Sequence, residues 1–337
     1  MKVIISPELF ASPIETLSLL VLFEHGWQGD HRIELDLEDP AIASWLALQP
    51  QDVREQCELA VDASAHDEAQ SPSVISIMVV TGDRSDWSCE PARLSLADAR
   101  ILLRRSFEIH VEDDTSDRAF LCKMMTSEER QLIETLEKTD RLRFVHGGGS
   151  RLKTRIERRA NEPEARLQTW VMFDSDAMRP GAASTHSDDV CAACEAASIP
   201  FHRLSRRFIE SYLPLDALER WGKARPSKRQ ENLPIFRAFA RLSPAQRDHF
   251  NMKKGFRADA ARSEEVGDLY EGLDSGDRER LSRGFGEKIG DLFQDRYPGQ
   301  SEGPSTTYVS ERELRRDGGW DELRPAVREL LGYLGGS

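Results

Sequence analysis

The sequence predicts an α/β fold in which a parallel sheet is flanked by helices on both faces. Segments with the two-residue periodicity of strands alternate with helix-like segments between residues 101 and 221. One of these strands, within residues 166–176, is largely apolar, as expected for a strand at the centre of such a sheet. The chain of 337 residues, 39% of them hydrophobic, is long enough for two or three domains.

The elements are expected in a regular order. Residues 1–100 are predicted to be an acidic α+β region, with strands at 2–6, 31–37 and 73–82 and a helix at 52–65. Residues 101–221 form the predicted sheet domain, with strands at 107–112, 141–146, 166–176 and 199–204, and helices at 116–137, 150–162, 187–198 and 205–221. Residues 222–337 are predicted to be mainly helical.

Charge is distributed unevenly along the chain. The net charge is −13, and residues 1–100 hold 6 basic and 18 acidic residues, whereas the rest holds 40 and 41. The acidic region is poorly suited to a polyanion, so we expect it to dock a basic partner surface or a second copy of the chain in a homo-oligomer. The remainder can still present a basic groove to nucleic acid.

The sequence also predicts a cytoplasmic protein without a membrane partner. No apolar run approaches the roughly 20 residues needed to cross a bilayer. The opening "MKVIISPELFASP" has too short an apolar stretch for a signal peptide. Five cysteines in a chain of this length favour a reducing compartment.

Acidic residues stand at the ends of two predicted strands. Glu112 ends one strand, and Asp174 and Asp176 form a D-x-D pair at the end of another, with a glycine turn at 147–149 between them in the sequence. The carboxyl ends of parallel strands share one edge of a sheet. Carboxylate oxygens at such an edge suit Mg²⁺ or Mn²⁺. The alternative is that these residues only cap loops and helices.

This arrangement resembles the TOPRIM domain, a Rossmann-like fold found in topoisomerases, bacterial primases and OLD-type nucleases. There, one strand ends in Glu, a middle strand in Gly and a third in D-x-D, and residues 101–215 are similar. The segments "FHRLSRRFIESYLP" and "FNMKKGF" look like OLD-type sequences in particular. No G-x-x-x-x-G-K-[ST] loop occurs, so the ATPase domain commonly fused to that family is missing from this sequence.

The resemblance implies a metal-dependent endonuclease of DNA or RNA that acts in antiviral (antiphage) defence, with a separately encoded ATPase or sensor subunit as partner. It assigns one cation to Glu112, Asp174 and Asp176, a second to Asp117 and Glu210, and charge neutralisation on the phosphate to Lys253. A non-catalytic TOPRIM-like interaction subunit is the alternative.

Two positions depart from the family pattern or leave a choice open. Asp113 replaces the usual Gly after the strand Glu, and Asp117 lies five rather than four residues after Glu112, so either Asp could hold the second cation. Lys253 and Lys254 both match the family's lysine. Glu210 has an alternative role as the i, i+4 partner of an Arg on the same predicted helix.

Basic residues on two predicted helices are candidate nucleic-acid contacts, although such residues also commonly decorate a solvated face. They are Arg151, Lys153, Arg206 and Arg207. A zinc site is the less favoured interpretation of four other residues, because the cysteines stand in an Ala-rich helix suited to packing on a sheet. These four are Cys191, Cys194, His186 and His202.

Overall fold

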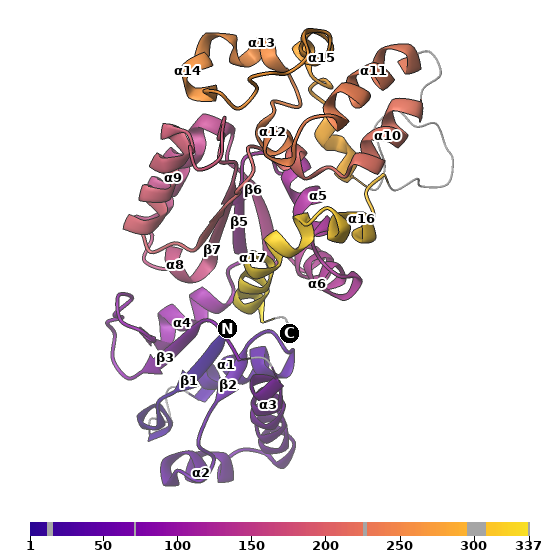
Figure 1. Ribbon diagram of the computed structural model, residues 1–337. Coiled ribbons are helices and arrows are strands. Elements are labelled where there is room, and N and C mark those ends of the chain that lie inside the picture. Colours follow the sequence, from indigo (N-terminus) through magenta and orange to yellow (C-terminus); the bar gives the residue numbers. More distant parts are fainter. Residues whose placement is uncertain (12–15, 71, 225–227, 295–307, 336–337) are drawn as a thin grey trace. The chain divides into compact units, whose positions relative to one another are not determined.

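The computed structural model describes residues 1–11, 16–70, 72–224, 228–294 and 308–335 (Figure 1). The chain forms two compact units. The first comprises Met1–Phe107, Gln131–Arg143 and Arg328–Ser337, and the second comprises Glu108–Arg130 and Phe144–Val327. The expected boundary between residues 100 and 101 falls inside helix α4 (Leu96–Leu103).

The first unit contains a four-stranded sheet in the order β2-β1-β3-β4, and each of its strand pairs is parallel. Its elements are β1 (Lys2–Ile5), η1 (Pro7–Ala11), α1 (Thr16–Trp27), β2 (Arg32–Glu34), α2 (Pro40–Ala47), α3 (Gln51–Gln70), β3 (Ser76–Val80), β4 (Ala92–Ser95) and α4. The predicted α+β class is therefore wrong for this region. Helix α1 carries the chain from β1 to β2, and such a helical crossover returns a strand in the same direction.

The second unit contains a four-stranded sheet in the order β6-β5-β7-β8, built from β5 (Phe107–Val111), β6 (Leu142–His146), β7 (Thr169–Phe173) and β8 (Phe201–Arg203). Strand β5 pairs with β7 in parallel, with Ile109 opposite Trp170, and β7 pairs with β8 in parallel. All five residues of β7 are buried, which agrees with its apolar sequence. The α/β class predicted for this part of the chain is confirmed.

Helices lie on both sides of this sheet, with α9 on one side of the strands and α5 on the other (Figure 1). The helices between the strands are α5 (Ser116–Lys123), α6 (Ser127–Lys138), α7 (Leu152–Arg159), α8 (Ala165–Gln168) and α9 (Thr185–Ala196), with η3 (Gly149–Arg151) before α7. On the α7 and α9 side, Ile156 and Val190 pack with Val171 and Phe173 of β7 in one apolar cluster.

The single helix predicted over residues 116–137 is two helices in the structure. The amide of Thr126 donates to Glu129 Oε2 at 2.8 Å, and the Glu129 amide donates to Thr126 Oγ1 at 3.3 Å. This reciprocal pair is a capping box, which starts a new helix. The motif T-x-x-E is present in the sequence and explains where α6 begins.

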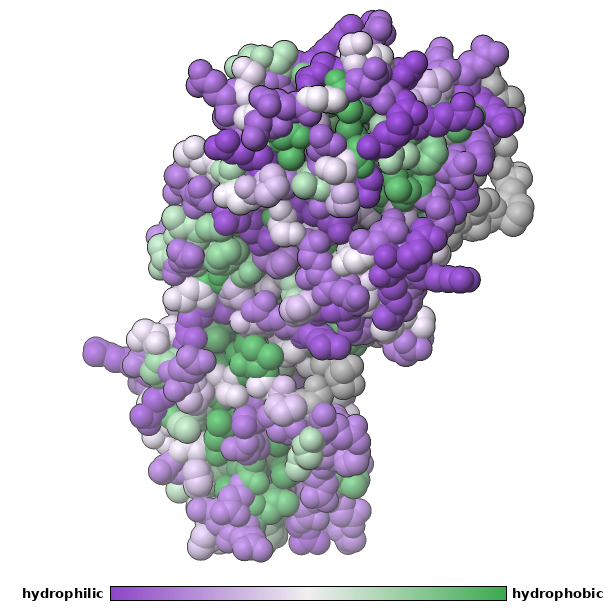
Figure 2. Space-filling view, in the orientation of Figure 1, coloured by the Kyte–Doolittle hydropathy of each residue, from purple (hydrophilic) through white to green (hydrophobic). Residues whose placement is uncertain are grey.

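The rest of the second unit is mainly helical in the residues that the structure describes, in agreement with the sequence. Its elements are η4 (Ile209–Tyr212), α10 (Leu215–Ala224), α11 (Arg229–Ala240), α12 (Pro244–His249), α13 (Phe256–Asp259), η6 (Ala260–Arg262), α14 (Ser263–Val266), α15 (Ser275–Arg280), η7 (Leu281–Arg283), η8 (Ile289–Phe293), α16 (Glu311–Arg316) and α17 (Gly319–Leu334), of which α17 ends in the first unit. The surface seen in Figure 2 is mostly hydrophilic over α11, α13 and α15. No helix in the described ranges is long and apolar enough to cross a membrane.

The helix predicted over residues 205–221 is wrong in its first half. Residues 205–208 form a bend, η4 is a short 3-10 turn, and the α-helix begins only at Leu215, directly after Pro214. Proline is tolerated just before a helix but disrupts one in its interior. Arg206 and Glu210 are therefore not neighbours on one α-helix.

Candidate functional site

Glu112 and Asp174 lie side by side at the carboxyl ends of adjacent strands. Glu112 directly follows β5 and Asp174 directly follows β7, and these two strands pair in parallel. The backbone amide of Asp174 donates a hydrogen bond to Glu112 Oε1 at 3.2 Å. The prediction that these two positions meet at one edge of the sheet is confirmed by that contact.

The D-x-D segment turns sharply after β7 and is tied to the segment that follows β8. Asp176 has φ of 51°, in the left-handed region that non-glycine residues seldom adopt. Its amide donates to the Arg207 carbonyl at 3.1 Å, and the Ser175 hydroxyl donates to the Arg206 carbonyl at 2.7 Å. The backbone at Asp176 is thus held in an uncommon conformation by its neighbours, which is frequent at functional sites.

Asp113 and Asp117 play different roles after β5. Asp113 Oδ1 accepts hydrogen bonds from the amides of Thr115 and Ser116 at 2.9 and 2.8 Å, so this carboxylate stabilises the turn that leads into α5. Asp117 is buried, and its Oδ2 accepts the Asp113 amide at 2.9 Å. Of the two residues left open by the sequence, Asp117 is the one whose carboxyl group lies in the interior with the other acidic groups.

Glu210 brings a further buried carboxylate to the same region. Its side chain is 1% exposed and its Oε1 lies 2.9 Å from Lys253 Nζ. A Cβ added to Gly290 in η8 would lie 2.6 Å from that same oxygen, so η8 approaches the carboxylate as closely as glycine permits. Lys254, in contrast, is 62% exposed and lies 3.6 Å from Glu287, which leaves Lys253 as the lysine of this cluster.

Burial and repulsion from neighbouring charges raise the pKa values of Asp117, Asp174 and Glu112. Burial raises the pKa of Asp117 to about 8, and the charges of Glu112 and Glu210 add to the rise. The pKa of Asp174 lies well above its usual range because of burial and then the Glu112 charge, and that of Glu112 is raised by burial and then by Asp176. Together with Glu210 and Asp176, these three groups form a single electrostatic cluster of five carboxyl groups.

Arg207 and Lys253 place positive charge beside this cluster of carboxyl groups. Burial raises the pKa of Asp176, and the nearby Arg207 guanidinium partly offsets the rise. Burial lowers the pKa of Lys253, but the charges of Glu210, Asp174 and Asp117 outweigh that effect and raise it above the usual value. Lys253 is therefore held as a cation beside the carboxylates.

The donor chemistry fits a divalent cation, although the groups are not gathered around one point. All the candidate ligands are carboxylates, and Glu210 Oε2 is buried without a hydrogen bond from any residue that the structure describes, while Oε1 contacts Lys253. Within the same ranges, no three His, Cys, Asp or Glu side chains are arranged to hold a metal ion. Three of these carboxylates instead contact groups of the protein itself. The Asp174 amide donates to Glu112, the Asp113 amide donates to Asp117, and the Lys253 ammonium contacts Glu210.

The predicted nucleic-acid contacts on α7 and the preceding turn are at the surface. Arg151 is exposed and makes no ion pair with any described residue, whereas Lys153 lies 3.0 Å from Asp189 on α9. Exposed ion pairs of this kind stabilise a protein by little, so Lys153 can exchange Asp189 for another anion.

The other two predicted contacts have structural partners. Arg207 is 1% exposed and forms a bidentate pair with Asp259, with both N–O distances 2.7 Å, so its guanidinium is not at the surface. Arg206 lies 3.1 Å from Glu322 and stacks 4.4 Å above the ring of Tyr212. The structure therefore gives Arg207 a buried structural role instead of the predicted phosphate contact.

His186 lies near the site, although no role in this cluster was predicted for it from the sequence. It stands in the first turn of α9, close enough to Glu112 and Asp176 to influence both pKa values, and its buried Nε2 has no hydrogen-bond partner among the described residues. Its only signal in the sequence was the spacing to Cys191 and Cys194. Cys194 lies in the apolar cluster on β7, with Cys191 packed against it, which agrees with the packing interpretation.

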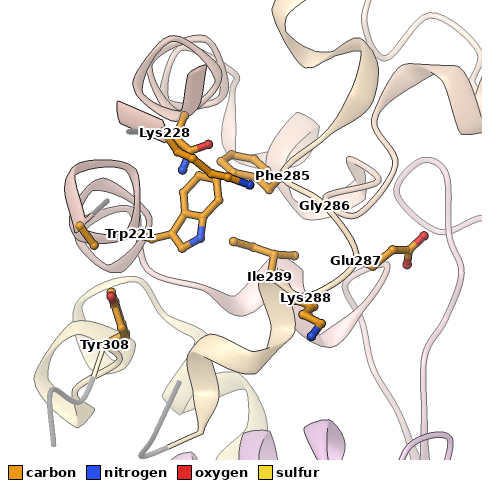
Figure 3. A pocket seen from close by; sticks show the side chains of 10 residues that line it. Trp221, Lys228, Phe285, Gly286, Glu287, Lys288, Ile289 and Tyr308 are labelled. Carbon is orange, nitrogen blue, oxygen red and sulfur yellow. The ribbon is translucent and has the colours of Figure 1, made fainter. Parts of the chain in front are cut away.

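A separate pocket lies among α10, α11 and η8 (Figure 3). Trp221, Phe285 and Ile289 line a cavity of about 290 Å³, with Lys228 at its side. None of the predicted site residues lines it. One of its lining residues, Ile289, directly precedes Gly290, the residue of η8 that approaches Glu210.

No family model, curated protein or solved structure matches this chain. Function is therefore argued from the carboxylate cluster and the groups around it.

Proposed function

We propose that the second unit is a divalent-metal-dependent nuclease that hydrolyses phosphodiester bonds of DNA or RNA. The observation that carries this proposal is the cluster of interacting carboxyl groups at the carboxyl ends of β5 and β7, with one lysine held as a cation beside them. Burying mutually repelling carboxyl groups costs stability, so their presence needs an explanation. Cation binding supplies one.

The acidic residues would form two cation sites. Glu112, Asp174 and Asp176 would hold one Mg²⁺ or Mn²⁺, and Asp117 and Glu210 a second. Bound cations of this kind activate water and stabilise the leaving oxygen of a phosphodiester.

Lys253 would contribute a positive charge for the phosphate. Glu210 orients its ammonium through the 2.9 Å contact, and the surrounding acidic groups keep it protonated. A fixed cation beside the scissile phosphate stabilises charge that develops during the reaction. The side chain is 35% exposed, so a substrate phosphate can approach it.

The order of a strand ending in Glu, a glycine turn and a strand ending in D-x-D also supports a TOPRIM-like, OLD-type assignment for this unit. That assignment carries two further parts of the proposal. The protein would act as the effector of an antiphage defence system, in the cytoplasm, and a separately encoded ATPase or sensor subunit would control it.

Incubation of the purified protein with plasmid, linear DNA and tRNA tests the proposal directly. Cleavage is expected with Mg²⁺ or Mn²⁺ and not with EDTA, and Asp174→Asn should reduce it by orders of magnitude. Asp321→Asn is the matched control, since Asp321 is an exposed carboxylate on α17 outside the cluster. Metal-dependent cleavage that persists in Asp174→Asn would place the activity elsewhere.

A non-catalytic interaction subunit is the second candidate, and a specific observation favours it. In the described part of the chain the carboxylates do not surround a common point, and Lys253 pairs with the carboxylate of Glu210. In that case Mn²⁺ should neither raise the melting temperature nor support cleavage. Titration of the wild type and of Asp174→Asn with Mn²⁺, followed by differential scanning fluorimetry, separates the two candidates.

A further inference from the structure

A groove of about 630 Å³ lies between α7 and the amino-terminal part of β5, apart from the residues proposed to bind metal. It is lined by Glu108, His110, Val145, Arg151, Thr154, Arg155, Arg158, Arg159 and Glu162. Its volume is within the range of about 300–1,000 Å³ that is usual for small-molecule sites. Every lining residue belongs to the second unit.

Three arginines give one side of the groove an unbalanced positive charge. Arg151, Arg155 and Arg158 are exposed, and none makes an ion pair with a residue in the described ranges. Their spacing of four and three residues places them along one face of the helical turn, over roughly 10 Å at 1.5 Å per residue. Guanidinium groups bind phosphate oxygens in pairs of parallel hydrogen bonds, and this length can accommodate more than one phosphate.

The deeper end of the groove has a different chemistry. Arg159 is buried there and is already engaged, with its Nε 3.0 Å from Thr169 Oγ1 and 3.5 Å from Glu108 Oε2. It also contacts Glu162. Carboxylates at this end would repel the phosphates of a strand continuing through the groove but can accept hydrogen bonds from hydroxyl or amino groups.

His110 forms part of this end and has a polar atom without a partner. The residue is 4% exposed, and its Nε2 lies 3.0 Å from Glu108 Oε2. Its Nδ1 is buried and makes no hydrogen bond to any residue that the structure describes. A buried polar atom without a partner is uncommon in folded proteins, and His110 lines the groove, so this side chain is a candidate to hydrogen-bond a ligand bound there.

We propose that this groove binds a nucleotide. Its phosphates would lie on Arg151, Arg155 and Arg158, and its sugar or base would lie against Glu108 and His110. The groove joins a cationic side to an end rich in hydrogen-bonding groups, which matches the two halves of such a ligand. The inference does not depend on the proposed nuclease activity, because it uses none of the residues assigned to the metals.

Isothermal titration calorimetry of the full chain in EDTA tests this proposal without any contribution from a metal site. The probes are ATP, tripolyphosphate, adenosine and a short single-stranded oligothymidylate. We expect saturable binding of ATP, weaker binding of tripolyphosphate and no detectable binding of adenosine. The double variant Arg155→Ala/Arg158→Ala should weaken ATP binding by roughly 10- to 100-fold, because two charge-assisted contacts are lost. Glu108→Gln should reduce the preference for ATP over tripolyphosphate.

The double variant Arg283→Ala/Arg312→Ala is the charge-matched control, since both are exposed arginines without an ion pair in the described part of the chain, and their loss should leave ATP binding unchanged. Circular dichroism checks that each variant is folded. Three results would overturn the proposal: no saturable ATP binding by the wild type, equal ATP affinity in the double variant, or arginine-dependent binding of the oligothymidylate with none of ATP. The last would assign the arginines to a nucleic-acid strand.

Discussion

Replacing Lys253 with methionine removes the cation that lies against a fully buried carboxylate. Glu210 is 1% exposed, and two unit charges at the observed 2.9 Å attract by about 6 kcal/mol at an effective dielectric constant of ~20. Lys253 is 35% exposed, and removing both groups from water has a cost, so the net coupling should be about 2–3 kcal/mol. We expect Lys253→Met to lower the free energy of unfolding by about 2–4 kcal/mol. Glu210→Gln should cost less, because the lysine can rehydrate.

Urea unfolding followed by circular dichroism, at neutral pH with EDTA, measures these costs for the wild type, both single variants and the double variant. The double variant should be about as stable as Glu210→Gln, since neither charge remains. Lys254→Met is the control, and its effect should stay within about 0.5 kcal/mol because Lys254 is exposed. Additive costs of the two single variants, or a Lys253→Met protein as stable as the wild type, would refute this account of the pair.

Three further predictions concern the same unit. Asp174→Asn should abolish the rise in melting temperature expected on adding Mn²⁺. The free energy of unfolding measured in EDTA should change by less than about 1 kcal/mol. A rise in melting temperature that persists in this variant would speak against a role for Asp174 in cation binding. Gly290→Ala should destabilise the protein by about 1–3 kcal/mol in urea, because its Cβ would lie 2.6 Å from Glu210 Oε1, and a neutral effect would mean that η8 moves freely. Burial raises the pKa of Glu313, but the Arg220 hydrogen bond and other contacts outweigh it and lower the pKa to about 2. The stabilisation of about 1–2 kcal/mol is therefore complete above pH ~4.5 and is lost as the pH falls toward ~2, so the stability difference between wild type and Glu313→Gln should shrink over that range.

The strands of the second unit could be predicted because their signals are local. Two-residue alternation marks β5, and four consecutive apolar residues at 170–173 mark β7. The rule that parallel strands present their carboxyl ends at one edge then brought Glu112 and Asp174 together without knowledge of their contacts. The capping box that starts α6 was also present in the sequence, so the helix break at Thr126 could have been predicted from it.

The roles of individual charged residues could not be predicted in the same way, because their partners are distant in sequence. Arginine is usually a surface residue, and the sequence around Arg207 does not show that Asp259, 52 positions later, binds it in the interior. Asp113 and Asp117 are equivalent by residue type, and only the turn into α5 shows which carboxylate faces inward. No sequence pattern connects His186 to Glu112, because two strands and several helices separate the two residues along the chain.

The buried pair of Arg207 and Asp259 limits how this protein can be divided into fragments. The Arg207 carbonyl accepts the amide of Asp176, and its guanidinium is held by Asp259 at the end of α13. A chain shortened to end between Glu210 and Lys253 would keep that guanidinium but remove its anion, which is destabilising. The carboxylate-bearing turn would lose its support together with Lys253. A fragment cloned for biochemical work that ends between residues 210 and 253 should therefore fail to fold even though every strand and every acidic residue of the site is retained.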